Sequence, residues 1–349
     1  MRRVLNLACR LVLALFAAGL VLYFSGYSPL AAYKAMIWGA VSSWDGIAQT
    51  LVQATPLIFT GLAVALANNC GVFNIGAEGQ LYLGAMAAAV LAAYLPPLPH
   101  LLHVIIALCG GALFGGLWAL IAAWLKIKAD ANEVIITIML NSIGTLLCAY
   151  LANYTFKAPG PVPQTPTIHS SAALSRLGQG AQFSSALFVG LFFVLVVWFL
   201  LYHTKLGYDL KVVGSNPRAA AAAGINVPQM IGLTLLLSGA LAGLGGAGQI
   251  LGLHGRYIDG FSPGYGFDGV AVAILGGNSP LGVLFSALLF GLMRAGGMIL
   301  DRTTNVPVDF VIIIQAAIIL FVSAPELLKT LKINWKKGGV KHARTVADK

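Results

Sequence analysis

The stretch that decides the fold is Asn68-Asn69-Cys70-Gly71-Val72-Phe73-Asn74-Ile75-Gly76-Ala77-Glu78-Gly79-Gln80. It lies between two long apolar runs, yet it contains a carboxylate, three asparagines and a glutamine. A charged side chain near the middle of a bilayer costs about 2.5–3.5 kcal/mol on insertion scales, and three glycines disfavour a helix. Irregular backbone at membrane depth survives only where protein or a water-filled cavity surrounds it. We therefore expect a broken helix beside a translocation path, with Asn74, Glu78 and Gln80 near that path.

The composition of the whole chain supports a membrane setting. The 349 residues are 58% hydrophobic and only 9% charged, and the mean hydropathy is +0.86. A soluble domain is about 25% charged, and apolar runs of about 18–20 residues recur here many times. The sequence predicts an all-α polytopic membrane protein. In a soluble protein the net charge of +10 would suggest nucleic acid as a partner. Here membrane topology explains it better, so we expect no nucleic acid partner.

The apolar runs predict about ten crossings, with broken or half helices among them. The first run, 11–24, follows a basic start and is expected to be an uncleaved helix that begins in the cytoplasm, and residues 25–50 are expected to be an external segment. A breaker at 276–280, Gly-Gly-Asn-Ser-Pro, separates a short, partly spanning helix from the span that follows. The remaining expected spans are 51–67, 81–95, 101–125, 134–151, 185–202, 230–251, 268–275 (partial), 281–300 and 308–322.

The basic residues set the orientation. With both termini in the cytoplasm, most of the 21 Lys and Arg residues fall on the cytoplasmic side, as the positive-inside rule requires. One basic residue, Arg294, remains inside a span. The external side keeps only Lys34, Lys157, Arg176, Arg256 and Arg302.

Two similar four-residue motifs suggest an inverted repeat within a single transmembrane domain, 1–349. Gly76-Ala77-Glu78-Gly79 and Gly266-Phe267-Asp268-Gly269 both precede apolar helices, and the expected topology starts these helices from opposite sides of the membrane. Transporters built from inverted repeats place their sites at the repeat interface. The expected parts are a first repeat 51–151, an external loop 153–184, a cytoplasmic coupling loop 203–229, a second repeat 230–322 and a basic cytoplasmic tail 325–349.

Two acids and two polar residues are the further pathway candidates. Glu78 and Asp268 either cap half-helices or accept hydrogen bonds from a polar cargo, and these roles are compatible. As acids within the membrane they also suit proton relays in a secondary transporter. Thr137 and Asn141 share one face of the fifth span, where they either bond to another helix or line a cavity.

Residues 214–225 are expected to form a small helix in the cytoplasmic loop. Asn216 suits the N-cap, Pro217 the first helical position and Gly224 the end. About two turns of alanine-rich helix are marginal alone but stable when docked into a partner. The alternatives are therefore a docking helix for a cytoplasmic protein and an ordinary connection.

The sequence also carries negative information. It contains no Gly-x-x-x-x-Gly-Lys-Ser/Thr motif, so the chain has no P-loop of its own. Residues 243–248 fit a dinucleotide fingerprint only literally, because no strand precedes them, and their glycines favour close helix packing. The four cysteines lack metal-site or disulfide spacing, and no nucleophile constellation occurs. We therefore expect a transport subunit rather than an enzyme, with no cofactor and no metal.

Three motifs together carry a family resemblance: residues 74–80, residues 132–141 and the coupling segment 214–225. The chain resembles the permease subunits of ABC importers for simple sugars and nucleosides, and most of all the nucleoside branch served by basic-membrane-protein-type lipoproteins. More distantly it is similar to ribose and branched-chain amino acid permeases. The likeness covers about residues 45–330. It departs from the usual Thr-Thr at Ile136-Thr137.

The resemblance implies a multi-pass protein of the bacterial inner membrane that imports a nucleoside or, alternatively, a sugar such as ribose. Its implied partners are a second, shorter permease, an ATPase with two nucleotide-binding halves and an external binding lipoprotein. By motif, Asn216, Pro217, Arg218 and Ala219 resemble the helix that docks on the ATPase. A proton-coupled secondary transporter that uses Glu78 and Asp268 is the rival from another class.

Overall fold

The computed structural model describes residues 2–177, 183–303, 310–318 and 320–321. Its contacts divide it into two compact units, one within residues 37–296 and one made of the described residues of 1–36 and 297–349. The expected basic tail, 325–349, lies outside the described residues, and the expected last span, 308–322, is described only at 310–318 and 320–321, which are helical.

The described chain is almost entirely helical, which confirms the all-α prediction. Its strands are limited to a short antiparallel hairpin, β1 (Arg176–Leu177) with β2 (Phe183–Ser184). The α-helices are α1 (Arg2–Phe24), α2 (Pro29–Val41), α3 (Trp44–Asn69), α4 (Ala77–Tyr94), α5 (His100–Ala129), α6 (Glu133–Tyr150), α7 (Ala186–His203), α8 (Lys205–Ser215), α9 (Pro217–Ala222), α10 (Val227–Gln249), α11 (Tyr265–Leu275) and α12 (Pro280–Thr303).

Six of the described helices are long and apolar enough to cross a membrane, namely α3, α5, α6, α7, α10 and α12. The residues 12–24 and 29–41 of α1 and α2 pass the same test only as a pair, bent by 120°. The chain is therefore a multi-pass membrane protein. The count of about ten crossings and the cytoplasmic position of both ends stay predictions.

The segment 25–50 differs from the expectation. It contains α2 and the beginning of α3, so the helix of the expected second span already begins at Trp44. Ser43 begins α3 earlier, because its side chain accepts a hydrogen bond from the backbone N–H of Gly46 at 3.1 Å, which is an N-cap. Hydropathy alone does not predict the first residues of α3 as helix, because the polar residues Asp45 and Gln49 lower the mean hydropathy there.

The predicted break after the second span is confirmed and is narrower than expected. Asn68 and Asn69 still belong to α3, and Glu78 to Gln80 already belong to α4, so only residues 70–76 leave the helix. The short eighth helix is confirmed as α11, and the Gly276–Pro280 breaker separates it from α12. Both interruptions occur at glycine with positive φ, Gly71 (74°) and Gly277 (62°), a conformation that costs glycine little.

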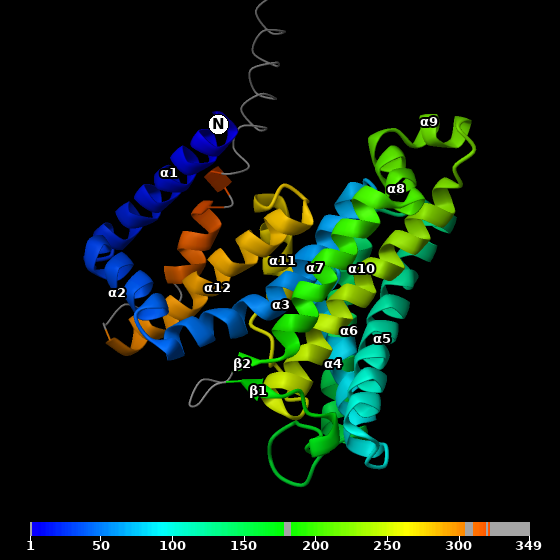
Figure 1. Cartoon of the computed structure of the whole chain (residues 1–349), viewed down its shortest axis with the longest axis horizontal. Helices are drawn as coiled ribbons and strands as arrows, with labels where there is room; N and C mark the ends of the chain where they lie inside the picture. The colour runs from blue at the N-terminus through cyan, green and yellow to red at the C-terminus, as the bar shows by residue number, and fades with distance from the viewer. Residues whose placement is uncertain (1, 178–182, 304–309, 319, 322–349) are drawn as a thin grey trace, which may run out of the picture. The chain divides into compact units, whose positions relative to one another are not determined.

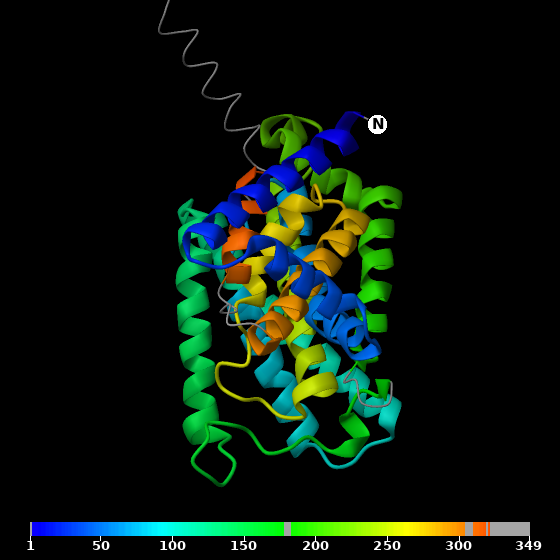
Figure 2. The same ribbon diagram turned by 90° about the vertical axis from the view of Figure 1, so that its left-hand side faces the viewer.

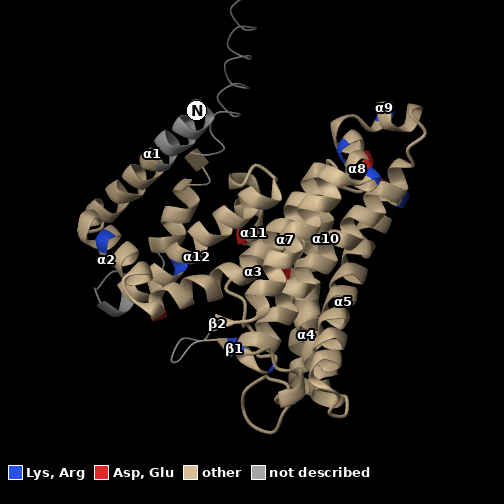
Figure 3. Ribbon diagram, in the orientation of Figure 1, with Lys and Arg blue, Asp and Glu red and all other residues tan. Residues whose placement is uncertain are grey.

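The unit Ile37–Gly296 is a bundle around α3. The most apolar 18 residues of this helix are 89% buried. Figure 1 shows α3, α4, α5, α7 and α10 side by side, with α8 and α9 at one end and the hairpin at the other, and the turned view in Figure 2 agrees. Lys and Arg residues gather around α8, α9 and the end of α5 (Figure 3), which fits a single cytoplasmic side.

A seam of glycines joins α4, α5 and α10. A Cβ added to Gly243 of α10 would lie 2.2 Å from the carbonyl oxygen of Gly111 on α5, and one added to Gly84 of α4 would lie 2.3 Å from the Cα of Gly243. Backbones this close need residues without side chains, which is how small residues associate helices in lipid. The close helix packing predicted for the glycines of residues 243–248 is confirmed at Gly243.

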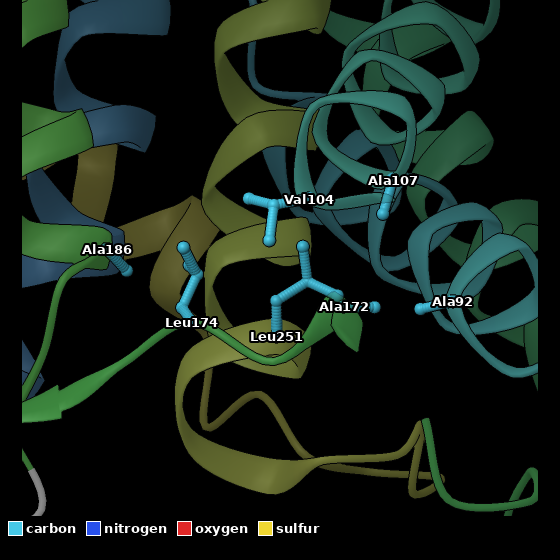
Figure 4. Packing of buried hydrophobic residues seen from close by; sticks show 7 residues of the cluster. All are labelled: Ala92, Val104, Ala107, Ala172, Leu174, Ala186 and Leu251. Atoms are coloured by element: carbon cyan, nitrogen blue, oxygen red, sulfur yellow. The ribbon is translucent and has the colours of Figure 1, made fainter. Parts of the chain in front are cut away.

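At the hairpin end, the loop after α6 is packed rather than loose. Ala172 and Leu174 of this loop pack against α4, α5, the start of α7 and the helical turn that follows α10. They form a buried apolar cluster (Figure 4) with Ala92, Val104, Ala107, Ala186 and Leu251. The backbone N–H of Leu174 also donates to the carbonyl of Leu251 at 2.8 Å. The loop therefore closes that end of the bundle.

The second unit has a small core of its own. Leu22 of α1, Ala32 of α2 and Leu300 at the end of α12 are buried together. The ring of Tyr27 packs edge-on against Phe310, with ring centres 5.4 Å apart.

We predict that Gly243→Ala destabilises the protein, although alanine favours helix by about 1 kcal/mol over glycine. The added methyl group would overlap the carbonyl of Gly111, and overpacking costs about 1–3 kcal/mol. Thermal unfolding in detergent measures the change. The matched control is Gly232→Ala on the same helix, where the nearest atom would be 3.8 Å away and the substitution should stabilise. Equal melting temperatures for the two variants would contradict the seam.

Candidate functional site

The break between α3 and α4 is held by a buried polar cluster. Asn74 and Gln80 form a reciprocal amide pair: the Asn74 Nδ2 donates to Gln80 Oε1 at 2.9 Å and the Gln80 Nε2 donates to Asn74 Oδ1 at 3.0 Å. Asn74 also donates to the hydroxyl of Ser238 at 2.7 Å and accepts from the backbone N–H of Gly76 at 3.0 Å. The Ser238 hydroxyl donates to the carbonyl of Ala63 at 2.6 Å. These contacts fix the non-helical backbone against α3 and α10.

Helix α6 supports the same break from another side. The Asn141 side chain accepts from the backbone N–H of Gly79 at 2.8 Å and donates to the carbonyl of Ile75 at 2.8 Å. It thereby satisfies one group on each side of the start of α4. Of the two roles expected for Asn141, bonding to another helix is the one seen. The Thr137 hydroxyl bonds back to carbonyls of its own helix, and its Cβ lies against Gly76.

Glu78 connects two half-helices. Its carboxylate accepts a hydrogen bond from the backbone N–H of Gly266, in the first turn of α11, while the start of α4 at Gly76 has no side-chain cap. A Cβ on Gly266 would lie 2.2 Å from the backbone nitrogen of Glu78. The starts of α4 and α11 therefore touch backbone to backbone. Glu78 does cap a half-helix, but the helix is α11 rather than its own.

Asp268 pairs with a base that the sequence left unassigned. Arg294 of α12 donates from Nε at 3.0 Å and from Nη2 at 2.6 Å to Oδ2 of Asp268. Its Nη2 also donates to the carbonyl of Pro263 at 3.2 Å, and its guanidinium lies 4.9 Å from the centre of the Tyr265 ring. Glu78 and Asp268 thus occupy similar positions at the starts of their helices but make different contacts. Glu78 caps a helix, and Asp268 forms an ion pair.

Two further contacts anchor the start of α11 to α3. The Tyr265 hydroxyl donates to Gln53 Oε1 at 2.8 Å, and the Thr60 hydroxyl donates to the carbonyl of Tyr265 at 3.0 Å. Ser262 accepts from the backbone N–H of Tyr265 at 3.1 Å. The first turn of α11 is therefore bound by α3, α4 and α12 at once.

The small helix α9 has the predicted anatomy. The Asn216 side chain accepts from the backbone N–H groups of Arg218 and Ala219 at 3.0 and 3.1 Å, and Pro217 begins the helix. Gly224 follows its end with φ of 82°. Only Ala220 is buried, so α9 presents an exposed surface that includes Arg218.

The helix before α9 lies directly on the break. A Cβ on Gly214 of α8 would be 2.2 Å from the carbonyl oxygen of Asn69, and a Cβ on Gly71 would be 3.1 Å from the Cα of Gly214. A rigid backbone contact therefore joins the α8–α9 segment to the first residues of the break.

The predicted pathway residues fall into two groups. Five of them are buried and lie together around the break: Asn74, Glu78, Gln80, Thr137 and Asn141. The sixth, Asp268, is partly exposed on the neighbouring α11. Sequence reasoning missed Arg294, Ser238, Gln53 and Tyr265. An arginine within an apolar span was the one available signal, because such residues are rare and paired. In the described part of the chain, no three His, Cys, Asp or Glu side chains gather as metal ligands.

Comparison with known proteins gives a consistent result. A family model described as a branched-chain amino acid transport system permease component matches residues 46–323. The guanosine ABC transporter permease protein NupP of Bacillus subtilis is 35% identical, covering 94% of this chain and 95% of its own length. The glucose ABC transporter permease protein TsgB13 of Haloferax volcanii is 36% identical (92% and 87%), and the nucleoside ABC transporter permease protein NupB of Lactococcus lactis is 32% identical (95% and 93%).

A second permease of Bacillus subtilis is also similar. The guanosine ABC transporter permease protein NupQ is 30% identical over 257 residues, covering 70% of this chain and 79% of its own length. Two different guanosine permeases of one organism thus resemble this chain.

We predict that Glu78→Ala lowers the free energy of unfolding by about 1–3 kcal/mol, because the buried N–H of Gly266 loses its acceptor. Glu78→Gln keeps an acceptor oxygen and should lose less. Thermal unfolding in detergent compares the two, with Gln229→Ala, at an exposed position in the first turn of α10, as control. A Glu78→Ala protein as stable as the control would show that the cap is dispensable.

Proposed function

Because the chain belongs to the family of branched-chain amino acid transport system permease components, which its residues 46–323 match, we propose that it is the permease subunit of an ATP-driven importer for nucleosides. It forms half of the translocation pathway and couples to a cytoplasmic ATPase. It is a transport component, as its relatives are, and the proposed location is the bacterial inner membrane.

The single observation that carries the cargo class is near-full-length similarity to guanosine and nucleoside permeases. The glucose permease relative, at 36% identity, favours a simple sugar as the second candidate. A proton-coupled secondary transporter is supported less well. Glu78 is engaged with the N–H of Gly266 and Asp268 with Arg294, so either acid would first have to break a contact to carry a proton.

The proposed partners are a second permease, an ATPase with two nucleotide-binding halves and an external binding lipoprotein. Similarity to both NupP and NupQ supports the second permease, since these are two guanosine permeases of one organism. The pathway then lies between two related subunits, and this chain supplies one wall.

The pathway residues take different parts in this proposal. Four of them hold the non-helical backbone of the break in place, because their side chains are buried and hydrogen-bonded within the protein: Asn74, Gln80, Thr137 and Asn141. Glu78 ties α4 to α11. The partial exposure of Asp268 supports it, among the six, as the residue that meets cargo.

The coupling route begins at α9. Asn216, Pro217, Arg218, Ala219 and Gly224 shape an exposed helix that suits a groove on the ATPase. The rigid contact between Gly214 and Asn69 supports a mechanical role, because movement of α8 and α9 would displace the break directly. The nearby Lys and Arg residues favour an acidic docking surface on the partner (Figure 3).

We predict that proteoliposomes holding the assembled transporter accumulate guanosine or another nucleoside only with ATP. Inactivating the partner ATPase should abolish uptake, since this chain has no P-loop. The control adds a proton gradient without ATP. Uptake driven by the gradient alone would favour a secondary transporter, and uptake of glucose in place of nucleoside would favour the sugar importer.

We predict that Arg218→Glu leaves the fold intact and uncouples ATP hydrolysis from uptake. Arg218 is exposed, and its helix is capped through its backbone N–H rather than its side chain. The measurement is the ratio of nucleoside moved to ATP hydrolysed, with Arg218→Lys as the charge-conserving control. Uptake at the wild-type level in the Glu variant would refute the docking of α9.

A further inference from the structure

The ion pair of Asp268 and Arg294 is partly open to the surroundings although it lies between membrane helices. Arg294 is within the apolar helix segment Pro280–Leu300. Asp268 is in the first turn of α11, and the Tyr265 carbonyl of that turn is bonded by Thr60, far from either end of α3. The side chains are 14% and 22% exposed. Charged groups in this position face a bundle interior or a water-filled cavity and do not face lipid. This face of α11 and α12 therefore borders water or a partner subunit.

The pair has unused hydrogen-bonding capacity. Both hydrogen bonds from Arg294 to Asp268 end on Oδ2. Within the described residues, no protein group binds Oδ1 of Asp268 or Nη1 of Arg294 at hydrogen-bond distance. One acceptor and one donor, held side by side, are thus available to a third polar molecule.

The surrounding contacts hold these groups in place without cargo. Pro263 and the ring of Tyr265 fix the guanidinium, and the Tyr265 hydroxyl is fixed in turn by Gln53. Such preorganisation reduces the entropy cost of binding. An ion pair also has no net charge, so it suits an uncharged polar cargo that must bind and then leave.

An aromatic ring lies next to the pair in the sequence. Phe267 precedes Asp268 on α11, and its side chain is 50% exposed. Aromatic faces stack on planar bases, and stacking is worth about 1–3 kcal/mol per base in nucleic acid complexes.

We propose that Phe267, Asp268 and Arg294 form a contact site for the nucleoside during its passage, an inference that rests on the proposed function. Phe267 stacks on the base, Oδ1 of Asp268 accepts from a ribose hydroxyl, and Nη1 of Arg294 donates to a carbonyl or ring nitrogen of the base. Arg294 is thus a specificity-determining residue.

The first test measures water access and needs no cargo. Phe267→Cys is made in a Cys9→Ser/Cys109→Ser background, where the remaining Cys70 and Cys148 are buried. A membrane-impermeant maleimide should label this variant in the assembled transporter. The matched control, Leu146→Cys, alters a 70% exposed residue on the apolar face of α6 and should react only with a lipid-soluble maleimide. Labelling of Phe267→Cys by the lipid-soluble reagent alone would overturn the proposal.

The second test uses cargo. Phe267→Ala should reduce uptake of guanosine about 10–100-fold, the value of one stacked base, whereas Phe267→Tyr should retain it. Asp268→Asn should reduce uptake of guanosine about 10–100-fold, the value of a hydrogen bond to a charged group, and should reduce uptake of a 2′,3′-dideoxynucleoside much less. Thermal unfolding of the Asn variant identifies any loss that stems from misfolding.

The results distinguish a failure of this site from a failure of the proposed function. A wild-type transporter that moves no nucleoside refutes the proposed function. A wild-type transporter that moves nucleoside, with equal uptake by Phe267→Ala and Phe267→Tyr and equal losses for both cargoes in Asp268→Asn, refutes this site and leaves the proposed function standing.

Discussion

The contact on which the architecture depends is the meeting of two helix starts, α4 and α11. Each start presents unpaired backbone N–H groups, and in a membrane no bulk water satisfies them. Gly266 has no side chain, so the backbone of α11 reaches the backbone of Glu78, and the Glu78 carboxylate accepts the Gly266 N–H. Negative charge also favours the positive ends of helices. One buried acid thus stabilises an interface that would otherwise bring two positive helix ends together.

The surrounding structure compensates for this break in two ways. Polar side chains from α6 and α10, above all Asn141 and Ser238, bond the irregular backbone that α3 leaves behind. Glycines in α4, α5 and α10 then let these helices approach closely enough for such short side chains to reach. The glycine content therefore serves close packing as well as helix interruption.

Local signals in the sequence predicted the interruptions well. Gly71, the 276–280 breaker and the Asn216–Gly224 helix were all identifiable, because caps, glycine and proline act over a few residues. The residues that bind Glu78 and Asp268 could not be predicted, because they are distant in the sequence. Gly266 is 188 residues from Glu78, and Arg294 belongs to the helix after the one that holds Asp268. The helical start of α3 before residue 51 was missed for another reason, because hydropathy does not detect a capped start such as Ser43. Periodicity correctly paired Thr137 with Asn141 but left open what Asn141 binds.

The same geometry explains how a signal at one end of the bundle can reach its middle. Gly214 lies against Asn69 and Gly71, the break continues to Asn74 and Glu78, and Glu78 holds the first turn of α11. Packed backbones transmit displacement because they cannot be compressed, and interfaces of this kind switch between discrete arrangements. A shift of α8 would therefore change the relation of α4 to α11 rather than be absorbed by soft side chains. Since Asp268 is in that first turn and Arg294 is not, the shift would also move one half of the ion pair relative to the other. A polar contact among the apolar helices would then open or close with the motion at α9, which is the coupling that an ATP-driven importer requires.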